Sequence, residues 1–591
     1  MSPKDLTKID PVMASVIQGA LQNIAVEMGH KLMRMAYSSI IRESEDFGAA
    51  LTDAEGLQIA ETTQSTPLQC GPIPGYVRDV LARIAERGDI IRDGDVILHN
   101  DPYGGASHGP DIAVIVPMFH EGTLVGFSCT TAHHLDVGAL TPGSAGIVDA
   151  IDVFAEGLQM KALKFHDAGR RNDVAWQFLR DNVRAPDMVV GDLEAQVAAC
   201  RIGAGRFAEL IGRYGVEAIR AAAADLMDYS ERLMRQAIAA LPDGTYRAET
   251  MLDGFLDDPA EHRRDLPVVV TLTVTGDELM VDLEGTAPQV EDRPVNMPFV
   301  GTTDIAVWLA VRSILLDSDT YGYIPQNSGL TRPITIRAPK GCLANPIFPA
   351  PVIARFTGGL QLSNTVMKAL AQAAPRLVSA GVGNLKVISF SGLRDTGHWV
   401  HMEIFEGSYG GRFGKDGLDA VDTLYANTRN NPIEDIESHL PLRVTRYELN
   451  DAGRPGAGKW RGGYGSIREF AFLETGGASV EGDGHKYRPW GFDGGTEGAT
   501  AALDLVDAAG TVRSMPSKIP YTRVGKGGVF RATGPAGGGY GDPFERDPAL
   551  VREDLLDGLL SAEAAAEDYG VVISASGEID LPATQARRTR A

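Results

Sequence analysis

The sequence predicts a mixed α/β (α+β) protein, a large multi-layer chain with a helical N-terminal half and a β-rich C-terminal half. Its 591 residues exceed what one small core usually holds, and 44% hydrophobic with 23% charged residues is an ordinary globular composition. Apolar residues recur at helical spacing along much of the first 245 residues. After residue 387, short strand-like alternations are separated by glycine-rich turns, and glycine supplies 68 residues in all.

The N-terminal elements follow from changes in the apolar period along the chain. A glycine-containing turn separates two short alternating runs, which predicts a hairpin soon after the first helix. In chain order we expect a helix over 11–41, strands over 47–53 and 54–60, a helix over 74–86, and strands over 95–99, 111–119 and 123–132.

The second part of the chain begins with a long helical stretch over 172–240 that ends at the turn Pro242-Asp-Gly-Thr. After it we expect strands over 267–274 and 279–283, helices near 302–315 and 360–373, short strands over 387–533, an amphipathic helix over 548–570, a short strand and a loose tail. We therefore predict three regions: 1–245 with hairpins and the long helical segment, 246–545 rich in β-strands, and 546–591 as C-terminal helix and tail.

Charge and cysteine content exclude several function classes. The formal net charge of −23 repels phosphate backbones and anionic lipid, so no nucleic-acid and no membrane partner is expected. No uncharged apolar run approaches the ~18 residues of a membrane span, and no signal peptide is visible. The four cysteines are widely spaced, which disfavours disulfides and thiolate zinc sites. A cytoplasmic protein is predicted.

Side chains that bind metals or transfer protons gather in the first 145 residues. His108 and Asp111 are separated by a Gly-Pro pair that forces a turn, and His133 stands at the end of the next strand. Since antiparallel neighbours bring these positions together, a His/Asp/His trio is expected, and Asp46 is a weaker further candidate. Imidazole with carboxylate favours Zn, Fe or Mn, with open positions for water or substrate. The segments concerned are 42–47, 99–108, 109–111, 131–136 and Thr141-Pro-Gly-Ser144.

Other interpretations of these residues stay open at this point. Histidine and aspartate beside glycine-rich turns often only hydrogen-bond to loop backbone, and the adjacent His133 and His134 cannot both face one site in a regular strand. The run from Gly453 to Lys459 begins like a phosphate-binding loop, but Trp460 stands where Ser or Thr should hold magnesium. A glycine turn between strands is the favoured interpretation there.

Several longer motifs together resemble the hydantoinase B family, the metal-bearing subunits of ATP-dependent hydantoinases, oxoprolinases and lactamases and the related subunits of acetone and acetophenone carboxylases. The match covers nearly the whole chain, and its most specific block runs from Asn100 to Asp111. The segments that carry it are Asp46-Phe47, 100–111, 133–138, 182–186, 191–196, 327–333, 489–491 and 537–543.

The resemblance implies a site and a partner. It puts the metal ligands on Asp46, His108, Asp111 and His133, and it makes His134, Asp136 and His99 candidates for fixing the ligand tautomers or for acid–base roles. The cofactor implied is a divalent transition metal (Zn, Fe or Mn). A hydantoinase A-like ATPase subunit, which carries ATP and Mg, is implied as partner in a heterotetramer or larger assembly.

The leading function hypothesis is therefore one subunit of an ATP-dependent hydrolase that opens hydantoin or lactam rings. The partner phosphorylates the amide oxygen, and a metal-activated water attacks the carbonyl carbon. The alternatives are a ketone carboxylase of the acetone or acetophenone type, and a scaffold that only stabilises the ATPase subunit. Two segments depart from the family pattern and leave the small-molecule substrate open: Pro67-Leu-Gln-Cys-Gly and the run from Arg355 to Ser363.

Overall fold

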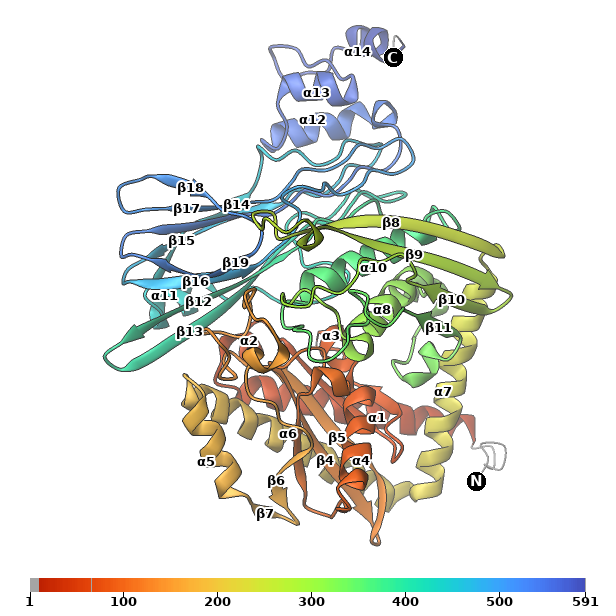
Figure 1. The fold of residues 1–591 in the computed structure, drawn as a ribbon. Coiled ribbons are helices and arrows are strands. Elements are labelled where there is room, and N and C mark those ends of the chain that lie inside the picture. The colour runs from red at the N-terminus through yellow and green to blue at the C-terminus, as the bar shows by residue number, and fades with distance from the viewer. Residues whose placement is uncertain (1–9, 65, 590–591) are drawn as a thin grey trace.

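The computed structural model describes residues 10–64 and 66–589, and its N-terminal region is built on one antiparallel sheet (Figure 1). The seven strands lie in the order β2-β1-β5-β4-β3-β6-β7. Their bounds are β1 (Phe47–Thr52), β2 (Gln58–Glu61), β3 (Val96–His99), β4 (Asp111–His120), β5 (Thr123–His133), β6 (Leu163–Asp167) and β7 (Arg170–Arg171).

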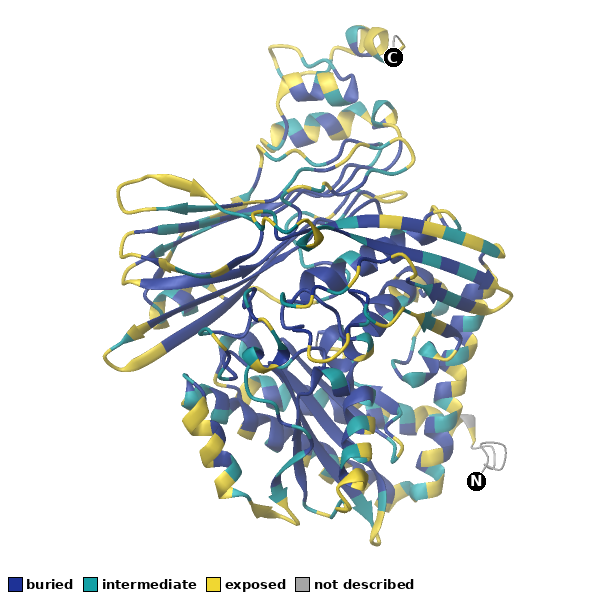
Figure 2. Cartoon of the chain, viewed as in Figure 1, coloured by how far each residue is buried: buried dark blue, intermediate teal, exposed yellow. Residues whose placement is uncertain are grey.

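Helices cover both faces of this sheet, which explains why its central strands are buried along almost their whole length (Figure 2). Alternate residues of β4 point to opposite faces. Ile112 and Val114 pack with α5 (Asp173–Asn182) and α6 (Pro186–Tyr214), whereas Ile115 packs with α4 (Ile73–Glu86) on the other face. The first helix, α1 (Pro11–Met35), packs against α6.

A second layer follows α7 (Val216–Ala239) and consists of a four-stranded sheet over two buried helices (Figure 1). The strand order is β11-β10-β9-β8, and β8 alternates exposed and buried residues because only one face meets the core (Figure 2). The elements are β8 (Gly244–Gly254), β9 (Arg264–Thr275), β10 (Glu278–Asp282), α8 (Asp304–Leu315), β11 (Ile334–Arg337) and α10 (Phe356–Leu370).

Two further sheets stack face to face in the C-terminal part. The rings of Phe390 and Phe470 lie 4.8 Å apart between them, and Phe390 and Phe530 lie 5.6 Å apart. One sheet has the order β13-β12-β16-β19 and the other β14-β15-β20-β17-β18. The strands are β12 (Lys386–Arg394), β13 (Gly397–Phe405), β14 (Leu442–Leu449), β15 (Ser466–Phe472), β16 (Gly476–Glu481), β17 (Ala502–Val506), β18 (Val512–Ser514), β19 (Ile519–Val524) and β20 (Val529–Thr533).

The C-terminal segment differs from the single helix and loose tail expected of it. Gly558, with φ of 76°, separates two helices, and a third helix takes the place of the tail. These are α12 (Pro548–Leu556), α13 (Ala562–Tyr569) and α14 (Leu581–Thr589). The remaining short helices are α2 (Ser39–Arg42), α3 (Pro67–Cys70), α9 (Ser318–Tyr321) and α11 (Ile433–His439).

The first helix is also shorter than its apolar spacing predicts. It ends at Met35, because the chain turns extended at Ala36, where φ is −64° and ψ is 146°. The backbone N–H groups of Tyr37 and Ser38 then donate to Oδ1 of Asp192, at 2.7 and 3.1 Å. The mixed α/β class is confirmed, and the N-terminal region contains a large sheet as well as its helices.

The largest buried cluster runs from Ile17 to Tyr540 and so includes residues on both sides of the predicted boundary near 245. Within residues 10–64 and 66–589, no helix has the length and apolar character needed to cross a bilayer.

Candidate metal centre

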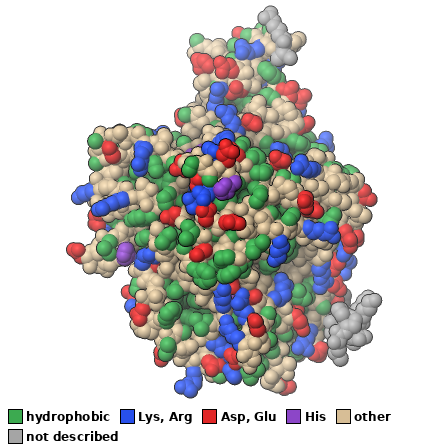
Figure 3. Space-filling view, in the orientation of Figure 1, with side chains coloured by type: hydrophobic (Ala, Val, Ile, Leu, Met, Phe, Trp, Pro, Cys, Tyr) green, Lys and Arg blue, Asp and Glu red, His purple; other side chains and the backbone are tan. Residues whose placement is uncertain are grey.

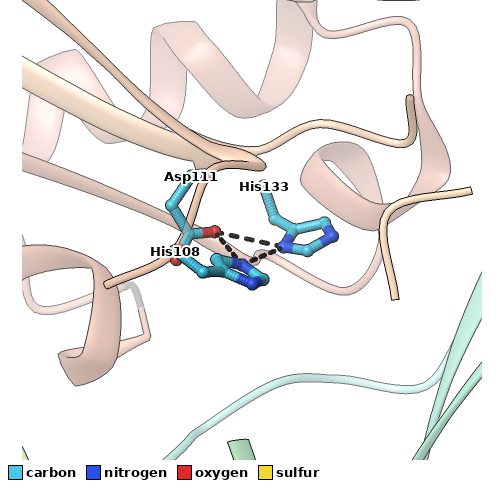
Figure 4. A group of neighbouring side chains, drawn as sticks. All are labelled: His108, Asp111 and His133. Atoms are coloured by element: carbon cyan, nitrogen blue, oxygen red, sulfur yellow. Dashed lines mark hydrogen bonds and ion pairs between the residues drawn. The ribbon is translucent and has the colours of Figure 1, made fainter. Parts of the chain in front are cut away.

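Three of the predicted ligands meet where β4 and β5 pair. Asp111 is the first residue of β4 and lies directly opposite His133, the last residue of β5. His108 precedes β4 by one tight turn, in which the N–H of Asp111 donates to the carbonyl of His108 at 3.2 Å. The expected His/Asp/His trio therefore forms, from two strand ends and one turn (Figure 4).

The donor atoms of the trio have the separations of one face of a metal coordination shell. Nε2 of His108 lies 3.2 Å from Nδ1 of His133, and each nitrogen lies 3.1 Å from Oδ1 of Asp111. Ligand atoms about 2.1 Å from one ion lie about 3.0 Å apart at right angles and about 3.4 Å apart at the tetrahedral angle. All three side chains are buried, so bulk water does not compete for these positions.

The outward-facing ring nitrogens make contacts compatible with the tautomers that metal binding needs. Nδ1 of His108 lies 3.0 Å from the carbonyl of Ile353, which can only accept, so that nitrogen carries the proton. Nε2 of His133 lies 2.7 Å from the hydroxyl of Ser144, which can accept or donate a proton. When Ser144 accepts, both rings present lone pairs toward the Asp111 carboxylate, the form in which they can coordinate a cation.

Electrostatics favour the ligand forms of His108 and Asp111. Burial, with the positive charge of Arg355, lowers the pKa of His108 to about 4, so this ring is neutral at physiological pH. Burial alone would raise the pKa of Asp111, but the charged and polar groups around it, among them the guanidinium of Arg355, outweigh burial, and the pKa lies well below the usual range. Neutral imidazole and ionised carboxylate are the forms that coordinate metals.

A small cavity of about 20 Å³ adjoins the trio, enough for one ion or one water molecule. Among the charged groups in its wall are Arg355 and Glu481. The guanidinium of Arg355 donates to Oδ2 of Asp111 at 3.1 Å and to Oγ of Ser107 at 2.8 Å. The complete lining of the cavity is Asp46, Leu68, His108, His133, Ala145, Arg355, Phe356, Val387, Met402, Ile404 and Glu481.

Asp46, the predicted fourth ligand, lines the same cavity but is not part of the group of closely spaced ligand atoms. Nε2 of Gln69 lies between two carboxylates and donates to Asp46 Oδ1 at 3.2 Å and to Asp111 Oδ1 at 2.9 Å. Burial raises the pKa of Asp46 to about 6. Its part in metal binding remains a prediction.

The three residues predicted for orienting or acid–base roles make their contacts elsewhere. His134 faces away from its neighbour and lies 2.9 Å from Oε1 of Gln196. Asp136 accepts from the backbone N–H and the guanidinium of Arg184. Nε2 of His99 lies 3.1 Å from the carbonyl of Gly104. These arrangements stabilise the surrounding loops, and direct roles in catalysis remain predictions.

Four side chains at the site were not predicted as functional: Gln69, Ser107, Ser144 and Arg355. Signals for all four existed in the sequence, and Ser107 lies in the segment 99–108, which is rich in polar groups. Gln69 and Arg355 lie in the two segments that depart from the family pattern, and Ser144 closes one of the segments rich in polar groups. Their contacts with the trio span up to 244 residues of chain, a distance that spacing arguments do not reach.

The glycine-rich run that begins like a phosphate-binding loop is a turn between loops in the structure. No helix follows Lys459, and Trp460 pairs with Tyr540 instead. Charged side chains of both signs are scattered over the face drawn in Figure 3, with no continuous basic patch on it.

Fold and site together define a large α/β protein with a buried nitrogen–oxygen site suited to a divalent cation. The chain belongs to the Hydantoinase B/oxoprolinase family, which it matches over residues 10–543. A protein of Pseudomonas sp. (strain NS671), named as a subunit of a D-/L-hydantoinase, is 58% identical over 585 residues, 99% of each chain.

Two solved structures share the fold. The ATP-dependent caprolactamase from Pseudomonas jessenii superposes with a TM-score of 0.87 at 29% identity, over 99% of this chain and 100% of that one. A nucleotide-free acetone carboxylase superposes with a TM-score of 0.86 at 21% identity, over 98% of this chain and 83% of that one. At that identity the second likeness concerns the fold alone.

Proposed function

We propose that the chain is the metal-bearing subunit of an ATP-dependent hydrolase that opens hydantoin or lactam rings. The observation that carries the proposal is the convergence of two imidazole nitrogens and one carboxylate oxygen beside a cavity of one-ion size. The names of the relatives, a D-/L-hydantoinase and an ATP-dependent caprolactamase, supply the substrate class.

The side chains present fit a divalent transition ion such as Zn, Fe or Mn. His108 Nε2, His133 Nδ1 and Asp111 Oδ1 would hold it, with Asp46 as a further ligand. A bound ion of this kind lowers the pKa of water toward ~7 and polarises a carbonyl oxygen. Arg355 neutralises Oδ2 of Asp111 and keeps that carboxylate oriented.

The chain itself contributes orientation and exclusion of water. Ile353 and Ser144 hold the two imidazole rings in place, and the apolar side chains around the cavity keep bulk water out. Glu481 in the cavity wall accepts a hydrogen bond from the backbone N–H of Thr357 at 2.9 Å, and burial raises the pKa of its carboxyl.

Activation of the amide falls to a partner in this proposal. A hydantoinase A-like ATPase subunit, with ATP and Mg, would phosphorylate the amide oxygen, because an unactivated amide is a poor electrophile. The two subunits would form a heterotetramer or larger assembly in the cytoplasm.

The test is reconstitution with that ATPase subunit, followed by assays of ring opening and ADP release with hydantoins and lactams. We expect His108→Ala to lose both turnover and the metal measured by elemental analysis, while circular dichroism stays unchanged. His120→Ala, on the same sheet but outside the trio, should keep both. Full metal occupancy in His108→Ala would refute the ligand assignment.

The same reconstituted complex decides between the alternatives. Incubation with ATP, labelled bicarbonate and ketones would produce labelled β-keto acid if the complex is a ketone carboxylase, and that result would overturn hydrolysis. A scaffold role predicts no stoichiometric transition metal and unchanged turnover in Asp111→Ala.

A further inference from the structure

A second cavity, of about 250 Å³, lies beside the metal centre and shares none of its lining residues. It is bounded by α3, α4, α7, α8 and the segment 326–334; in Figure 1, α3 and α8 lie near the centre, α4 below them and α7 along the right side. Much of its wall is apolar: Leu57, Met234, Ile305, Trp308, Leu309 and Leu330. A cavity of this size and character suits a small molecule with an apolar body.

Two arginines of this wall, Arg78 and Arg312, make no hydrogen bond or ion pair through their guanidinium groups within the described part of the chain. Arg312 is half-buried and Arg78 is exposed, and Glu61 and Asp304 act on them only through longer-range electrostatics. Their N–H groups are therefore free to bind an anionic ligand, and the half-buried guanidinium of Arg312 gains most from such a partner.

Two neutral polar atoms in the wall are also unsatisfied. Gln58 is 5% exposed, and its Nε2 donates to Glu61 Oε2 at 2.6 Å, while its Oε1 accepts no hydrogen bond from the described residues. The buried Nε1 of Trp308 donates none to them. Buried polar atoms without partners are rare and mark places where a ligand can supply them. Both atoms belong to side chains of the wall, and each can bind a ligand once its side chain turns toward the cavity.

We propose that this cavity binds a small carboxylate that carries an amide or ureido group and an apolar side chain, the class formed when a hydantoin or lactam ring opens. The carboxylate pairs with Arg312 and Arg78. The ligand's N–H donates to Gln58 Oε1, and its carbonyl accepts from Trp308 Nε1. That such a ligand is the product of this protein's own reaction rests on the proposed function. The existence of the binding site does not depend on it.

One helical turn separates this site from the metal centre. Pro67 of α3 and Gly71, directly after it, line the larger cavity, whereas Leu68 lines the metal cavity and Gln69 binds Asp111. A Cβ on Gly71 would lie 2.9 Å from Cδ1 of Ile305, so α3 packs directly on α8. The segment Pro67-Leu-Gln-Cys-Gly, which departs from the family pattern, is therefore the partition between a ligand site and the metal centre.

The experiment is calorimetric titration of the full chain with both enantiomers of N-carbamoyl-leucine. We expect saturable binding that Arg312→Gln weakens by about 10-fold or more, because a charge-assisted hydrogen bond is lost. Trp308→Phe keeps an aromatic ring, loses the N–H and should weaken binding by a smaller factor. Arg337→Gln, an exposed arginine of β11, is the matched control and should bind normally.

The neutral analogue N-carbamoyl-leucinamide should bind poorly, since it lacks the carboxylate. Absence of saturable binding at millimolar ligand, or equal binding by Arg312→Gln with an unchanged circular dichroism spectrum, would overturn the site. His108→Ala should bind the ligand normally while its complex lacks turnover. If the wild-type complex opens no hydantoin or lactam, yet the chain binds the ligand saturably and Arg312→Gln weakens that binding, the proposed function is wrong and the binding site is supported.

Discussion

Glu156 couples the stability of the metal-centre region to pH. Its side chain is 2% exposed, accepts hydrogen bonds from the backbone N–H groups of Val352 and Ile353, and leaves Oε2 without a partner among the described residues. The carbonyl of Ile353 in turn fixes the tautomer of His108. Burial raises the pKa of Glu156 from its ordinary 4.5 to about 8, despite the two backbone donors.

The sign and size of the effect follow from linkage. Between pH 4.5 and 8 the folded chain keeps a proton that the unfolded chain has released, so stability falls as pH rises through this window. The contribution is fully present below the unfolded pKa and is lost above the folded one. At about 1.36 kcal/mol per pH unit, the whole fall is about 5 kcal/mol, and about 3 kcal/mol of it lies between pH 6 and 9.

Glu156→Gln isolates this contribution. The amide oxygen still accepts from Val352 and Ile353, but no proton is lost at alkaline pH. In urea unfolding at pH 6 and pH 9, we expect the variant to lose about 3 kcal/mol less than the wild type. Glu497→Gln, at an exposed position, serves as control and should follow the wild type. Parallel stability curves for Glu156→Gln and wild type would refute the buried-acid argument.

Two further predictions concern the immediate support of the site. Gln69→Leu removes the donor to Asp111 and should weaken metal binding by about 10–100-fold in a chelator competition, with unchanged affinity contradicting it. Gly105→Ala should lower the melting temperature more than Gly122→Ala. Both glycines have positive φ (103° and 77°), but a Cβ on Gly105 would lie 2.5 Å from the backbone of Gly75, whereas Gly122 faces open space. We expect a cost of about 1–2 kcal/mol at Gly122 and about 1–3 kcal/mol more at Gly105; equal melting temperatures would contradict the steric argument.

The part of the site that sequence predicts is the part made by local structure. Asp111 and His133 meet because β4 and β5 are consecutive strands joined by a tight turn, and their pairing follows from the alternation of apolar residues. His108 follows from the Gly-Pro turn before β4. These contacts can therefore be predicted from residues 108–133 alone, without the rest of the chain.

Contacts between distant segments explain what sequence could not predict. The apolar spacing continues beyond Met35, and the helix ends there because Tyr37 and Ser38 donate to Asp192, which lies 155 and 154 residues away in the chain. Arg355 reaches Asp111 across 244 residues. Residue spacing contains no information on such pairs, since they depend on how the layers pack.

The charges around the small cavity give an independent argument for a dication. Asp46 and Glu481 line it and Asp111 adjoins it, so three carboxylates lie close to the guanidinium of Arg355. Burial raises the pKa of Asp46 to about 6 and raises that of Glu481, because an ionised carboxylate loses its solvation here. An ion of charge +2 neutralises the set, because three negative charges then face three positive ones. Since Arg355 and Glu481 come from beyond residue 245 and the trio from before it, this balance exists only when both parts of the chain fold together.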